Sequence, residues 1–198
     1  MVRSSLAEPT RPTAWMLLAA TCGVLFGSAL SAVAQPEAEA RSFVGPEIVL
    51  IDYGIICQTT PEGSRPAPET LMGEINLINR SQDMDITTRV VPAKLGFSFG
   101  VKFMRAPGGG TRDIVVTVTH PPMGDAGVER ERWTATVGEL GPSLNLFSFE
   151  MPYEMVKGPW SFALSDGAEV LMEQHFEVVS ELAAPGVLGV CFGQDFLS

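Results

Sequence analysis

The feature that most constrains this chain is a repeated alternation of apolar and polar side chains over short segments. In the clearest case, one face of a segment carries Phe97, Phe99, Val101 and Phe103. A period of two is the pattern of a β-strand, because successive strand side chains point to opposite faces. The chain also holds 20 glycines and 15 prolines, which favours many turns over long helices. An all-β fold is therefore predicted.

Roughly eight or nine short strands are expected, with no long helix or internal repeat visible in the sequence. We expect strands at residues 48–57, 74–79, 87–91, 97–103, 113–120, 131–137, 144–150, 160–165 and 169–179. The Pro/Gly/Ser-rich residues 59–70 are expected to form a loop. Pro121 and Pro122 are expected to end a strand, because proline cannot donate to a β-ladder. Strands of this length and spacing are typical of a β-sandwich or barrel.

Two segments carry more detailed expectations. One face of the strand at 48–57 is expected to carry Val49, Ile51, Tyr53, Ile55 and Cys57. Residues 157–179 contain a tight Asp-Gly turn between two alternating segments. They look like the closing hairpin of many immunoglobulin-like domains, which indicates a fold and no activity.

Composition excludes several classes of protein. The hydrophobic fraction is 45% and the charged fraction 18%, which excludes a disordered chain. The net charge of −10 argues against nucleic acid as a partner, because binding to phosphates depends on lysine and arginine. The same charge disfavours docking on anionic lipid.

The N-terminus has the three parts of an export signal. Arg3 and Arg11 precede an uncharged stretch at 14–30, which ends in the small residues 31–34. We expect a signal peptide at 1–34 with cleavage after Ala34, no stable membrane span after cleavage, and a periplasmic or secreted protein. An uncleaved membrane anchor is the alternative, but the stretch is barely long enough to span a bilayer, which favours cleavage.

The remaining chain is expected to divide into three parts. Residues 35–46 should be a flexible lead-in and 47–181 a single β-sandwich domain. Residues 182–198 form a C-terminal tail, in which the apolar run at 187–192 could be a last strand. Residues 35–198 hold 11 basic and 22 acidic residues, a net charge of −11.

Removal of the signal would leave two cysteines, Cys57 and Cys191. In an oxidising compartment, an even pair indicates one disulfide. Two buried free thiols are the alternative.

Several segments together resemble a bacterial family, domain of unknown function 3859. The match spans about residues 48–179, and the segments that carry it are 52–55 (DYGI), 91–96 (VPAKLG), 118–123 (VTHPPM), 158–162 (GPWSF) and 173–176 (EQHF). The resemblance implies a single, often exported β-sandwich domain and supplies no catalytic residues.

The most distinctive local motif is His120-Pro121-Pro122-Met123. A histidine at a strand end before a rigid loop could bind a partner, or a soft metal such as copper through His120 and Met123. The simpler interpretation is that His120 continues the inward face of its strand and bonds a local carbonyl. The sequence favours the second, and no cofactor is expected.

Acidic side chains cluster at Asp83-Met84-Asp85 and at Asp125, Glu129 and Glu131. They lack the spacing of a calcium loop and are expected to be solvated surface charge. A carboxylate pair such as Asp113 and Glu131 could cleave glycosides only if the two lay about 5–9 Å apart.

The GxSxG spacing occurs at 96–100 (GFSFG), but inside an alternating strand segment and without the strand-to-helix turn of a nucleophile elbow. The sequence contains no HExxH motif, so it favours a protein that is not an enzyme. The first hypothesis is an exported, non-catalytic binding or structural module of the cell envelope, with a protein or envelope component as partner. Loop-tip side chains would form its surface, for example Met123, Tyr153, Met155 and Trp160. The alternative is a metal-binding or hydrolytic protein centred on His120.

Overall fold

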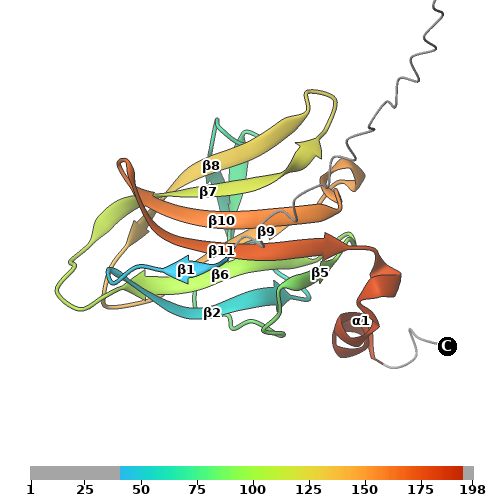
Figure 1. Ribbon diagram of the computed structural model, residues 1–198, viewed down its shortest axis with the longest axis horizontal. Coiled ribbons are helices and arrows are strands. Elements are labelled where there is room, and N and C mark those ends of the chain that lie inside the picture. Colours follow the sequence, from blue (N-terminus) through green and yellow to red (C-terminus); the bar gives the residue numbers. More distant parts are fainter. Residues whose placement is uncertain (1–40, 194–198) are drawn as a thin grey trace, which may run out of the picture. The chain divides into compact units, whose positions relative to one another are not determined.

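Residues 41–193 are described by the computed structural model, and they form a β-sandwich with a separate hairpin (Figure 1). The larger sheet has the order β1-β11-β10-β7-β8, and β5 pairs with β11 in parallel. Its strands are β1 (Phe43–Val44), β5 (Val90–Pro92), β7 (Arg112–Met123), β8 (Val128–Val137), β10 (Gly158–Asp166) and β11 (Glu169–Val179). The predicted all-β class is confirmed.

The second sheet and the remaining elements complete the domain. The second sheet has the order β2-β6-β9, with strands β2 (Ile48–Ile56), β6 (Ser98–Arg105) and β9 (Ser143–Ser148). A two-stranded hairpin pairs β3 (Gly63–Pro66) with β4 (Glu74–Leu77). Residues 41–193 also contain three short helices, η1 (Pro152–Glu154) between β9 and β10, and η2 (Glu181–Ala183) and α1 (Pro185–Phe192) after β11.

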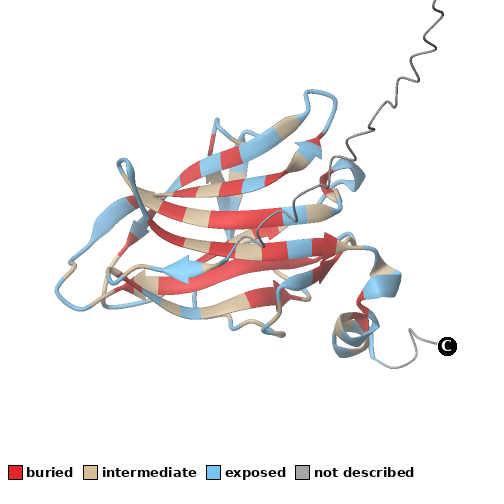
Figure 2. Ribbon diagram, in the orientation of Figure 1, coloured by how far each residue is buried: buried red, intermediate tan, exposed pale blue. Residues whose placement is uncertain are grey.

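Aromatic side chains from both sheets meet in the core. Phe99 of β6 is fully buried, and its ring centroid lies 5.4 Å from Trp160, 5.8 Å from Phe162 and 5.4 Å from Phe176. The predicted inward face at 97–103 is confirmed, since Phe97 and, on β6, Phe99, Val101 and Phe103 are all buried. Figure 2 shows the buried positions concentrated along β6, β10 and β11. Edge-to-face contacts of this kind add to the area buried.

The predicted face of β2 is wrong over its first half. Val49 and Ile51 are 41% and 46% exposed, whereas Ile48 is buried. The pairing register of β2 with β6 shifts between Leu50 and Asp52. One irregular residue exchanges the inward and outward faces of a strand, which a strict alternation overlooks.

Two predictions at turn residues are also wrong. Strand β7 runs through Pro121 and Pro122 to Met123, and its register with β8 shifts between Thr119 and Met123. The prolines therefore lie at an irregular part of the ladder, where a missing donor costs least. In the predicted loop at 59–70, Gly63–Pro66 forms β3. With β1 as a further unpredicted strand, the described chain has eleven strands rather than eight or nine.

The two ends of the domain also differ from expectation. Phe43 and Val44, placed in the lead-in by the sequence, pair with β11. The expected last strand at 187–192 is part of helix α1. An apolar run of this length has no decisive periodicity, and Pro185 suits a helical first turn. The predicted signal at 1–34 lies outside the described residues. Within residues 41–193, no helix is long and apolar enough to cross a membrane.

Candidate binding groove and the predicted site residues

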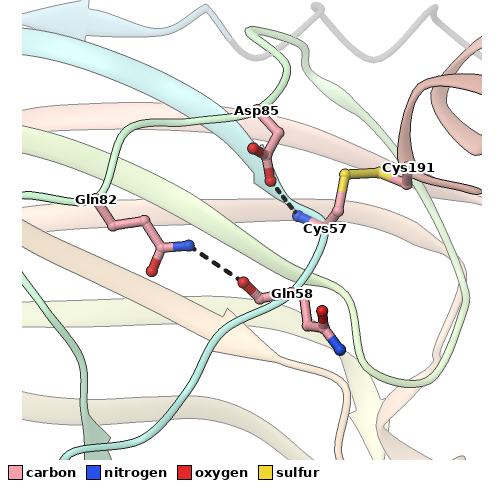
Figure 3. Close-up of a disulfide and its surroundings, with 5 residues drawn as sticks. All are labelled: Cys57, Gln58, Gln82, Asp85 and Cys191. Atoms are coloured by element: carbon pink, nitrogen blue, oxygen red, sulfur yellow. Dashed lines mark hydrogen bonds between the residues drawn. A yellow bond between two sulfur atoms is a disulfide. The ribbon is translucent and has the colours of Figure 1, made fainter.

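The predicted disulfide is confirmed. Cys57, just after β2, is bonded to Cys191 of α1, with Cα atoms 5.4 Å apart and a sequence separation of 134 (Figure 3). The Cys57 backbone N–H also donates to Oδ2 of Asp85 at 2.8 Å. The bond therefore fastens the C-terminal helix to the end of a core strand.

The acidic cluster at 83–85 is exposed, as expected, but it also holds its loop in place. Nζ of Lys102, a nearly buried residue of β6, lies 2.7 Å from Oδ1 of Asp83 and donates to the carbonyl of Gln82 at 3.0 Å. Asp85 accepts a hydrogen bond from the Cys57 backbone N–H. The carboxylates of Asp83 and Asp85 therefore both anchor the loop before β5 to the second sheet.

His120 has the inward orientation that the simpler interpretation predicts. It is 3% exposed, and its Nδ1 lies 2.9 Å from the Pro121 carbonyl oxygen. A carbonyl only accepts, so Nδ1 carries the proton and donates. The imidazole packs on the Trp160 indole at 4.7 Å between centroids.

The proposed loop-tip surface around this motif does not exist as predicted. Met123 and Trp160 are each 1% exposed, because both contribute to the core instead. Tyr153 is exposed and Met155 is half-buried. Within residues 41–193, no group of three or more His, Cys, Asp or Glu side chains is arranged to hold a metal ion.

The carboxylates Asp113 and Glu131 are far apart. Asp113 of β7 pairs with Thr136 of β8, whereas Glu131 pairs with Val118. Five residues along a strand correspond to about 16 Å, well beyond the separation that glycoside hydrolysis requires.

A groove of about 440 Å³ lies between the β3–β4 hairpin on one side and strands β8 and β9 on the other. Its rim includes exposed residues of the hairpin, among them Met72 and Leu77, so it is open to solvent. The sequence did not indicate this site, because half of the hairpin was predicted to be a loop. The lining residues come from three separate parts of the chain, 59–80, 131–136 and 143–154, and no sequence motif connects them.

Polar side chains at the floor of the groove hold one another. The Trp133 indole N–H on β8 donates to Oδ1 of Asn145 on β9 at 3.0 Å. The Asn145 amide donates in turn to the Ser143 hydroxyl at 2.9 Å. All three residues are buried. The Trp133–Asn145 bond links the edges of the two sheets, and the Asn145–Ser143 bond lies within β9.

Carboxylates line one end of the groove. Glu131 is 6% exposed and accepts from the Leu71 backbone N–H at 2.9 Å, which corrects its expected place at the solvated surface. Glu154 is 3% exposed, and its Oε2 accepts from the backbone N–H groups of Glu150 and Met151. Burial, with smaller contributions from Glu150 and Glu131, raises the pKa of Glu154 above its ordinary value.

The hairpin is fastened over the groove by a few polar contacts. The Arg65 guanidinium donates to the Thr134 carbonyl of β8. The backbone carbonyl of Glu69, between β3 and β4, accepts from the backbone N–H of Arg132 at 3.1 Å. These contacts satisfy some of the backbone groups along the outer edge of β8, the last strand of the larger sheet.

The architecture defines a β-sandwich protein with an open groove at one side. Residues 44–178 match the family model described as domain of unknown function (DUF3859), and the chain belongs to that family. The resemblance predicted from the sequence is thus confirmed.

The other two comparisons add no function to the family assignment. No curated protein matches the chain. Among solved structures, it is similar to an immunoglobulin-like protein from Pseudomonas aeruginosa at 22% identity and a TM-score of 0.44. The alignment covers 72% of this chain and 99% of that one.

Proposed function

We propose that this protein is an exported, non-catalytic binding or structural module of the cell envelope, whose partner is a protein or an envelope component. The Cys57–Cys191 disulfide carries this proposal, because structural disulfides persist in oxidising compartments outside the cytoplasm. The signal-like residues 1–34 support it. The groove between the hairpin and the β8 and β9 edges supplies a surface for a partner.

A metal-binding or hydrolytic role centred on His120 has less support. The imidazole is buried against Trp160 and bonded to its own neighbour Pro121. Met123 is buried as well. A soft-metal site needs ligands that converge on one point, and residues 41–193 contain no group of three or more His, Cys, Asp or Glu side chains arranged to hold a metal ion.

Export is tested with the full chain expressed in a bacterium and fractionated. We expect a processed, oxidised protein in the periplasm or medium, with Gln35 at its N-terminus by mass spectrometry. A cytoplasmic protein that retains residues 1–34 would contradict the proposal.

The binding role is tested by cross-linking the mature protein in envelope extract and identifying what it captures. We expect one partner enriched over a control with an unrelated β-sandwich of similar charge. Capture equal to that control would contradict a binding role. Elemental analysis of the same purified protein tests the metal-binding form of the alternative, which requires stoichiometric metal.

A further inference from the structure

We propose that the groove binds an extended, basic peptide segment of a partner protein, which adds as a strand along the free edge of β9. This inference rests on the proposed binding role and names the chemistry of the partner. Strand addition gives affinity through main-chain hydrogen bonds and specificity through alternate side chains.

The edge of β9 is the first observation. Strand β9 has six residues and pairs with β6 on one side. All six of them, from Ser143 to Ser148, line the groove, and so do all four residues of β4 across from it. Among the described residues, no backbone hydrogen bond joins β9 to β4. In an antiparallel pair, every second residue directs its N–H and C=O away from its neighbour, so this edge offers unpaired groups to a ligand.

The charge of the lining selects a basic peptide. Four carboxylates line the groove, from Glu74, Glu131, Glu150 and Glu154, against the two guanidiniums of Arg65 and Arg80. The Arg65 guanidinium is engaged with the Thr134 carbonyl. A lysine or arginine side chain entering the groove would therefore meet net negative charge, whereas an acidic segment would be repelled.

Glu154 provides a second, independent indication of a ligand. Its side chain is almost fully buried, yet it lines the groove. Both of its hydrogen bonds end on Oε2, which leaves Oε1 without a hydrogen bond among residues 41–193. Oε1 is not among the buried side-chain atoms without a partner, so it is accessible from the groove. A cationic side chain at this point would supply its missing donor.

The rim favours a peptide whose other side chains are apolar. Met72 and Leu77 are 49% and 42% exposed on the hairpin and line the groove. Because strand side chains alternate, a bound segment with basic and apolar residues in turn would place one set against the carboxylates and the other against this rim. The probe is therefore a short peptide of alternating lysine and valine.

The peptide is titrated into ¹⁵N-labelled protein of the mature chain and followed by NMR. We expect saturable shifts confined to β4, β8, β9 and the Trp133 indole.

Two isomeric peptides test strand addition, one N-methylated on the lysine amides and the other on the valine amides. Only every second residue bonds an adjacent strand, so one isomer should lose binding and the other keep it. Equal binding of both isomers would overturn strand addition.

Charge reversal tests the electrostatic part. Glu150→Lys, at an exposed position of the groove, should weaken peptide binding by about tenfold or more. Glu169→Lys, at an exposed position at the start of β11, is the matched control and should leave affinity within about twofold. Equal weakening in both variants, or no binding of the peptide to wild type, would overturn the proposal.

The two proposals fail in different ways. If the envelope partner is captured equally by wild type and Glu150→Lys, the binding role stands and the groove assignment is wrong. If nothing is captured while the lysine–valine peptide binds the groove, the groove is a peptide site and the envelope role is wrong.

Discussion

A Cβ atom at Gly54 would lie 1.9 Å from the carbonyl oxygen of Ile86. That oxygen accepts from the Ile55 N–H at 2.9 Å, so the loop before β5 is bonded directly to β2. Gly54 also has a φ of 146°, which side chains rarely adopt. We expect Gly54→Ala to lower the free energy of unfolding by about 2–4 kcal/mol, measured by urea denaturation.

Gly141→Ala is the control for that prediction. Gly141 is exposed and lacks a positive φ, and a Cβ atom added there would meet no other atom within 4 Å. Its unfolding free energy should stay within about 0.5 kcal/mol of wild type. Equal effects at the two glycines would refute the close approach of β2 and residue 86.

Removing the disulfide should destabilise the folded domain. The Cys57–Cys191 bond closes a sequence separation of 134, for which the chain-entropy model gives about 4–5 kcal/mol. We expect the double variant Cys57→Ser, Cys191→Ser to unfold at lower urea than oxidised wild type. Reduced wild type should match the variant, and a reduced protein as stable as the oxidised one would contradict the prediction.

His120 is expected to tolerate a ring better than a small side chain. Its Nε2 is buried without a partner among the described residues, which costs about 1–3 kcal/mol, while its ring packs on Trp160. His120→Phe keeps the packing and removes the unpaired atom, so it should lie within about 1 kcal/mol of wild type. His120→Ala should lose about 2–4 kcal/mol. Thermal unfolding of both variants with and without copper separates this packing role from a metal role.

Glu154 should make stability depend on pH. Burial raises the pKa of Glu154 in the folded state above the ordinary value of 4.5. At a pH between 4.5 and the folded-state pKa, the folded state therefore binds more protons than the unfolded state. The free energy of unfolding contributed by Glu154 therefore falls as pH rises through this range. Glu154→Gln keeps an oxygen acceptor but should flatten the decline in unfolding free energy. The control Glu169→Gln should show the same decline as wild type. Urea titrations from pH 4.5 to neutrality measure both slopes, and parallel slopes for wild type and Glu154→Gln would contradict the assignment.

The strands with strong alternation were predictable, and those without it were not. In β6 the inward residues recur at every second position, so periodicity alone identified the strand and its face. Strand β3 has the sequence Gly-Ser-Arg-Pro, which is a turn composition held as a strand only by its pairing with β4. Bulges such as that near Leu50 depend on the partner strand and leave no local pattern.

The candidate groove lay beyond prediction for a related reason. Trp133 and Asn145 come from strands in opposite sheets, and their contact follows from how the sheets pack. The disulfide was easier to predict, because the two cysteines outside the predicted signal allow a single pairing. The inward direction of His120 followed from the apolar face of its own strand, whereas its contact with Trp160 did not.

The bond between Cys57 and Cys191 also has a mechanical consequence. It encloses β3 to β11 in one covalent ring, so a force applied to the two ends of the chain bypasses everything inside. Only β1 and β2, before Cys57, lie in the load-bearing path of the described domain. An oxidised molecule stretched in an atomic force microscope should therefore release a short contour length, and a reduced one the length of the whole sandwich.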